Sequence, residues 1–82
     1  MKRVLVIAKF DQAEAMRVAS GLVLLDDKVR VAVIGSLEKT AEVAEQKDVL
    51  DFAEVPYEII DAEAPLARIA QEIVTADVVF IL

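Results

Sequence analysis

The densest apolar stretch of the chain reads MRVASGLVLLDDKVRVAVIG and covers residues 16–35. Its first part places Ala19, Leu22 and Val23 at the spacing of one helix face. Two aspartates then form a tight turn, and residues 29–34 follow as a largely β-branched run. Because this run lacks the polar alternation of a half-exposed strand, both of its faces are expected to be buried, as in a parallel sheet. The stretch therefore predicts a helix, a turn and a buried strand.

The remainder of the chain continues the alternation of strand and helix. Asp11 and Ser36 are the predicted N-caps of the first two helices. The apolar phase of the second helix drifts, which predicts a break near residues 46–48. Gly21 inside the first helix costs about 1 kcal/mol relative to alanine, and it predicts a close approach of that helix to a strand. Further strands are predicted at residues 3–8, 57–60 and 78–82, and the helices at residues 11–25, 36–53 and 65–75.

This order of elements, βαβαβαβ, predicts a single α/β domain over residues 1–82. Strands that alternate with helices are joined by right-handed crossovers, in a parallel sheet with helices on its faces. We therefore expect a small three-layer fold of the flavodoxin-like type, with a mostly parallel four-stranded sheet. The common doubly wound arrangement gives the expected strand order 2-1-3-4.

The composition indicates association between copies of the chain. The chain has 82 residues, and 57% of them are apolar, above the roughly 45–50% of ordinary domains. Small domains are marginally stable and are often reinforced by disulfides or metals, but this sequence has no cysteine and no histidine. Three helices also leave part of a doubly buried four-stranded sheet uncovered. We therefore expect a homo-oligomer in which a partner chain covers apolar surface.

The charge of the chain argues against two classes of partner. The formal net charge is −6, and the nine basic residues are scattered along the sequence. Phosphate backbones are bound by clustered lysine and arginine, so no nucleic-acid partner is expected. The same charge balance disfavours binding to an anionic membrane surface, and no apolar run approaches the ~20 residues of a membrane span. The expected location is the cytoplasm.

The inventory of reactive side chains favours a non-catalytic protein. Without cysteine and histidine, catalysis by a thiol or by a serine–histidine pair is excluded. The turn after the first strand reads AKFDQ, residues 8–12, and it has no glycine. Neither G-x-G-x-x-G nor a Walker A sequence occurs in the chain, so no nucleotide cofactor is expected. The leading interpretation has no catalytic residue, no cofactor and no metal site.

Four residues are candidates for ligand binding. Asp11 and Asp61 follow the first and third predicted strands, and they are expected to face one another across the carboxyl edge of the sheet, where open α/β sheets bind ligands. A carboxylate pair there would hold Mg²⁺ or perform acid–base work. The competing interpretation makes Asp11 a helix cap and Asp61 the start of a turn. Phe10 and Tyr57 would line a pocket, or belong to the core or to an interface.

Part of the chain resembles the DsrE-like sulfur-relay proteins. Residues 15–22, AMRVASGL, and residues 26–31, DDKVRV, are similar to the A-x-R-x-A-x-x-L helix of that family and to its D-x-V-x-V turn into the second strand. Residues 50–56 and 76–79 look similar to later elements of the family. The resemblance implies a small α/β fold that assembles into homo- or hetero-oligomers. It also implies a persulfide-carrying cysteine after the third strand, but residues 59–62 contain none, so sulfur transfer by that mechanism is not expected.

A second resemblance gives an alternative interpretation. Residues 3–8 and 31–35 are similar to the start of electron-transfer flavoprotein subunits, whose flavin site lies outside these segments. The leading hypothesis is a non-catalytic DsrE-like protein that acts as an oligomeric binding or sulfur-relay accessory protein. The alternatives are an electron-transfer-flavoprotein-like fragment, or a metal- or nucleotide-binding module or enzyme that uses carboxylates at the carboxyl edge of the sheet.

Overall fold

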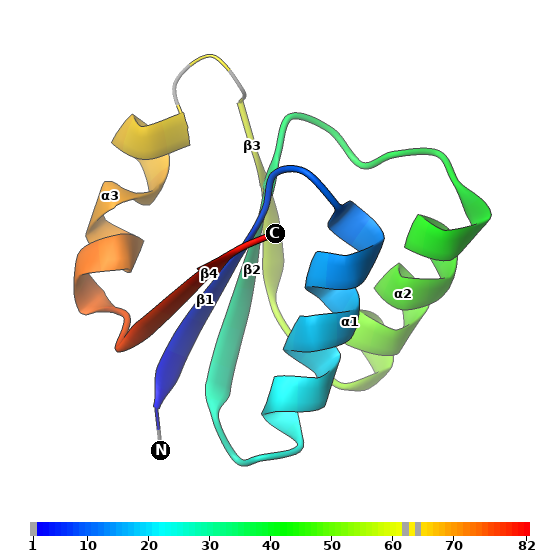
Figure 1. Ribbon diagram of the computed structural model, residues 1–82, viewed down its shortest axis with the longest axis horizontal. Helices are drawn as coiled ribbons and strands as arrows, with labels where there is room; N and C mark the ends of the chain where they lie inside the picture. The colour runs from blue at the N-terminus through cyan, green and yellow to red at the C-terminus, as the bar shows by residue number, and fades with distance from the viewer. Residues whose placement is uncertain (1, 62, 64) are drawn as a thin grey trace.

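The computed structural model describes residues 2–61, 63 and 65–82, in which strands and helices alternate along the chain (Figure 1). The predicted βαβαβαβ order and three-layer α/β fold are confirmed, with a four-stranded parallel sheet between two helices on one face and one helix on the other. None of the helices in this described part of the chain has the length and apolar content that crossing a membrane requires. In chain order the elements are β1 (Arg3–Ala8), α1 (Gln12–Val23), β2 (Lys28–Ile34), α2 (Ala41–Phe52), β3 (Tyr57–Ile60), α3 (Pro65–Thr75) and β4 (Val78–Ile81).

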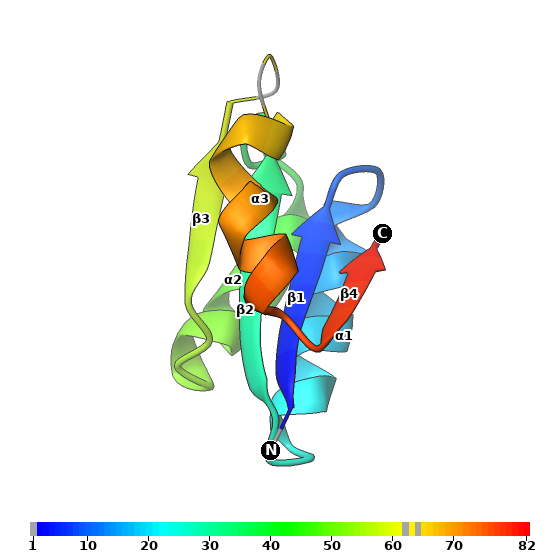
Figure 2. The ribbon, with the colours of Figure 1, turned by 90° about the vertical axis from the view of Figure 1, so that its left-hand side faces the viewer.

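The strand order is β3-β2-β1-β4, so the predicted order 2-1-3-4 is wrong. Val43 and Leu50 of α2 are buried in the same core as Met16 of α1, and both helices therefore lie on one face of the sheet. Right-handed crossovers on a shared face carry the chain in one direction, which places β3 beyond β2. α3 then covers the opposite face and returns the chain to the far side of β1, where β4 pairs with it (Figure 2).

β1 is an inner strand, and its two faces are buried as predicted. Val4, Val6 and Ala8 belong to the core under α1 and α2. The alternate residues Leu5 and Ile7 belong to a separate core under α3, because successive side chains of a strand point to opposite faces. One helix covers less of a sheet than two, so the α3 face retains exposed strand surface.

α1 begins where the sequence predicts and ends earlier than predicted. The Asp11 carboxylate accepts the N–H of Glu14 at 3.1 Å, which confirms the predicted N-cap. The helix ends at Val23, and Asp26 adopts a left-handed conformation with φ 66° in the turn that follows. Leu25 lies inside the predicted helix but outside α1, and it is exposed.

α2 begins later than predicted, and its N-cap is Thr40, not Ser36. The hydroxyl of Thr40 accepts the N–H of Val43 at 3.1 Å. The carbonyl of Ser36 is instead bound by a side chain of α1, which holds the connection ahead of the helix. The predicted break is also wrong, because α2 is continuous. Its buried residues are Val43 and Leu50, so the drifting apolar phase reflects side chains that face solvent.

Candidate functional site

The strand order diverges at the carboxyl end of β1, the position where open α/β sheets bind ligands. α1 leads from β1 toward β2, while β4 lies on the other side of β1. The N–H groups of Lys9 and Phe10 in the loop after β1 donate to the carbonyl of Leu82, at 2.9 and 2.8 Å. A phosphate group would need such amides, and the Asp11 carboxylate at the start of α1 would repel it. This position is therefore poorly suited to a phosphate group.

Asp11 and Asp61 have separate local roles in the structure. Asp11 caps α1, and the Asp61 carboxylate accepts the N–H of Glu63 at 2.9 Å in the turn after β3. β2 lies between β1 and β3, so the strands that lead to these residues are about 10 Å apart at the usual strand spacing. The described residues hold no group of three or more acidic side chains arranged to bind a metal ion. Ligand binding by this pair stays a prediction.

Phe10 follows the carboxyl end of β1, whereas Tyr57 begins β3 and pairs with Val31 in the middle of β2, and a pocket lined by these two residues stays a prediction. Phe10 is 75% exposed, with the Lys9 ammonium 5.1 Å from its ring centroid. Tyr57 packs, half-buried, against the core under α1 and α2. The Lys47 ammonium of α2 lies 5.8 Å from the centre of its ring. Hydrogen bonding to Tyr57, and then to Asp51, raises the pKa of Lys47.

A buried glutamine that the sequence does not predict as important joins two loops at the carboxyl end of the sheet. Gln12 is 5% exposed. Its amide nitrogen donates to the carbonyl of Ser36 at 2.8 Å, and its amide oxygen accepts the N–H of Glu38 at 2.8 Å. Both polar atoms of the side chain are therefore used to tie the start of α1 to the loop before α2. The sequence feature that could have indicated this role is a polar residue in the first turn of a helix that follows a buried strand.

β4 forms an apolar edge of the sheet. It pairs with β1 on one side and is the outermost strand on the other. Its side chains are all apolar, and those of Phe80 and Ile81 are 38% and 59% exposed. The outer side of this strand, together with Phe80 and Ile81, is called the β4 edge below. The exposed residue Phe10 lies close to the end of β4 along the main chain, because its N–H donates to the carbonyl of Leu82 directly after that strand.

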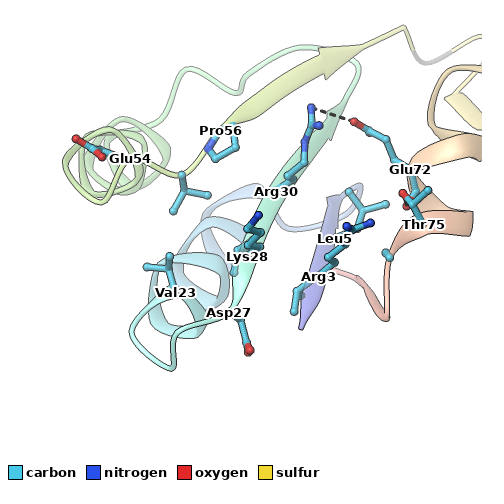
Figure 3. Close-up of a pocket in the computed structure, with 14 residues that line it drawn as sticks. Arg3, Leu5, Val23, Asp27, Lys28, Arg30, Glu54, Pro56, Glu72 and Thr75 are labelled. Atoms are coloured by element: carbon cyan, nitrogen blue, oxygen red, sulfur yellow. Dashed lines mark hydrogen bonds and ion pairs between the residues drawn. The ribbon is translucent and has the colours of Figure 1, made fainter. Parts of the chain in front are cut away.

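A pocket of about 560 Å³, called the amino-end pocket below, opens at the amino end of the sheet (Figure 3). Arg3, Lys28 and Arg30 line it, so three of the nine basic residues of the chain meet there. They are distant in sequence, but the parallel register places Arg3 beside Lys28 and Leu5 beside Arg30. In the sequence, Lys28 and Arg30 are two positions apart, and this spacing puts both side chains on one face of β2.

The molecule is thus a small three-layer α/β protein, and its described residues form an apolar strand edge at β4 and a pocket at the amino end of the sheet. No protein-family model matches this sequence, and neither a curated protein nor a solved structure matches it. What the protein does must therefore be inferred from these surfaces and from the chemistry that its side chains allow.

Proposed function

We propose that this chain is a non-catalytic α/β protein with a DsrE-like fold, which acts by binding and works as a homo-oligomer in an accessory role to a sulfur relay. The sequence supplies no cysteine to carry a persulfide and no histidine to act as a base at neutral pH. This inventory supports a binding role over a chemical one. The observation that carries the proposal is the apolar β4 edge.

An open strand edge in a monomeric protein is normally protected. Edge strands carry charged side chains, proline or a bulge, because their free N–H and C=O groups otherwise pair with another chain. The strand Val78–Ile81 carries no charged residue and no proline. The Leu82 N–H donates to the carbonyl of Ile7 at 2.9 Å, and since N–H groups alternate along a strand, that of Val79 points outward. The β4 edge therefore offers apolar side chains and free main-chain groups together.

A second copy of the chain is the occupant that fits the β4 edge. Each copy carries a net charge of −6, so two copies associate best through a surface where like charges do not meet. β4 is such a surface, because none of its residues is charged. A two-fold axis through this edge would pair the two β4 strands antiparallel and join two four-stranded sheets into one. It would also remove Phe80 and Ile81 of both copies from water.

The mass in solution, measured by light scattering after size-exclusion chromatography, tests this proposal. We expect at least twice the 9.0 kDa of one chain. The variant Ile81→Lys should have the mass of one chain, because a lysine on an edge strand blocks pairing. Val74→Lys is the matched control, because Val74 is 82% exposed on α3, outside β4, and this variant should keep the larger mass. A single-chain mass for the unmodified protein, or a dimer that survives Ile81→Lys, would contradict the proposal.

A further inference from the structure

Two unpaired cations lie side by side in the amino-end pocket. Arg3 of β1 and Lys28 of β2 are register partners, so their Cα atoms are about 5 Å apart and their side chains leave the same face of the sheet. Within the described residues neither side chain has a hydrogen bond or an ion pair. The Asp77 carboxylate accepts the main-chain N–H of Arg3 at 2.8 Å and does not bond its guanidinium. Like charges side by side on a sheet are destabilising, so this pair suits an anion bound between them.

The other charged residues around the pocket leave this pair without a counter-charge. The guanidinium of Arg30 is engaged by Glu72 of α3, with Nη2 and Oε1 2.9 Å apart, as the dashed line in Figure 3 marks. Asp27 and Glu54 also line the pocket, but Figure 3 shows their carboxylates pointing outward, away from the guanidinium of Arg30 and the ammonium of Lys28. The pocket therefore presents positive charge on a protein whose net charge is −6.

The walls of the amino-end pocket are largely apolar, which narrows the class of ligand. Val23, Leu5 and Pro56 contribute to them, and the volume of about 560 Å³ lies within the range for sites that hold small organic molecules. Inorganic phosphate would neutralise the two cations, but it would leave the apolar walls of the pocket in contact with water. A polyanion such as nucleic acid would be repelled by the rest of the protein, because three basic residues do not offset its negative charge.

We propose that the amino-end pocket binds a small amphipathic carboxylate. The carboxylate group lies between Arg3 and Lys28, where it forms charge-assisted hydrogen bonds with both, and the hydrocarbon part lies against Leu5 and Pro56. This inference names a ligand class for the binding role proposed above and rests on that role, but it does not depend on the β4 edge.

Calorimetric titration with octanoate tests the ligand class. We expect saturable binding of one octanoate per chain, weakened roughly tenfold or more by Lys28→Gln and by Arg3→Gln, since each removes a hydrogen bond between charged groups. Lys39→Gln is the matched control, because Lys39 is exposed in the loop between β2 and α2, at the opposite end of the sheet. It removes the same charge and should change the affinity by less than about twofold. Octylammonium, with the same hydrocarbon chain and the opposite charge, should not bind.

Three results would overturn the inference: no octanoate binding, equal binding of octylammonium, or an octanoate affinity that both Lys28→Gln and Arg3→Gln leave unchanged. Both side chains are exposed and unpaired within the described residues, so the two variants should melt at the temperature of the unmodified protein. A loss of binding then cannot be attributed to unfolding. Ile81→Lys should still bind octanoate, so a failure of the oligomer proposal and a failure of this one are distinguished by separate measurements.

Discussion

At the scale of single residues, Gln12 is a buried polar side chain that bonds two main-chain groups distant in sequence. We expect Gln12→Ala to lower the free energy of unfolding by about 1–3 kcal/mol, because the carbonyl of Ser36 and the N–H of Glu38 both lose their partner. Urea denaturation measures this change. Gln71→Ala, at an exposed position of α3, is the control and should stay within about 0.5 kcal/mol of the unmodified protein. Equal effects of the two substitutions would show that the bridging role is incorrect.

The residues that the sequence predicts correctly have local partners, and those that it does not predict have distant ones. Asp11 caps a helix by bonding the main chain of Glu14, three positions on, so its residue type and spacing are sufficient. The partners of Gln12 are 24 and 26 positions away. Arg3 and Lys28 meet only through the register of β1 and β2. A single sequence contains no local pattern that identifies such non-local pairs. The amino-end pocket could therefore not be predicted from basic residues that are scattered along the chain.

At the scale of elements, α1 contains a position where stability can be gained. The sequence predicts that Gly21 allows a close approach to a strand, but this is wrong, because Gly21 is exposed and a Cβ atom there would meet nothing within 4 Å. We expect Gly21→Ala to raise the free energy of unfolding by about 0.5–1 kcal/mol, since alanine loses less backbone entropy in a helix. Ala44→Gly, at an exposed position inside α2, should lower it by a similar amount. Urea denaturation of both variants checks the pair, and a loss of stability in Gly21→Ala would reveal an unrecognised contact.

The elements themselves are largely predictable, because hydrophobic periodicity is a local property of the chain. The predicted β3 and α3 have the observed bounds, and β1 spans residues 3–8 as expected. The larger errors fall at the C-terminal end of α1, at the start of α2 and at the break predicted inside α2. The late start of α2 has a tertiary cause, because Gln12 holds the carbonyl of Ser36 and the helix is then capped at Thr40. Whether a residue caps a helix thus depends on its tertiary contacts as well as on its type, and these contacts cannot be read from the local sequence.

At the scale of the whole molecule, alternating strands and helices specify the hand of each crossover but not the face that each helix covers. The prediction of the strand order fails for this reason. The choice of face is made by Val43 and Leu50 of α2, which are buried in a common core with Met16 of α1. The expectation that three helices leave part of the sheet uncovered depends only on counting elements, and it agrees with the exposure of Phe80 and Ile81 at the β4 edge. The homo-oligomer itself stays a prediction.

Hydrogen exchange along β4 locates the interface between copies of the chain. The N–H of Leu82 donates to Ile7, and the alternation along a strand directs that of Phe80 toward β1 and that of Val79 outward. In a dimer paired through the β4 edge, the Val79 amide gains a partner, and its exchange measured by NMR should be as slow as that of Phe80. In Ile81→Lys the Val79 amide should exchange rapidly while Phe80 stays protected, so Phe80 serves as the internal control. Rapid exchange at Val79 in a protein of dimeric mass would place the interface on a surface other than β4.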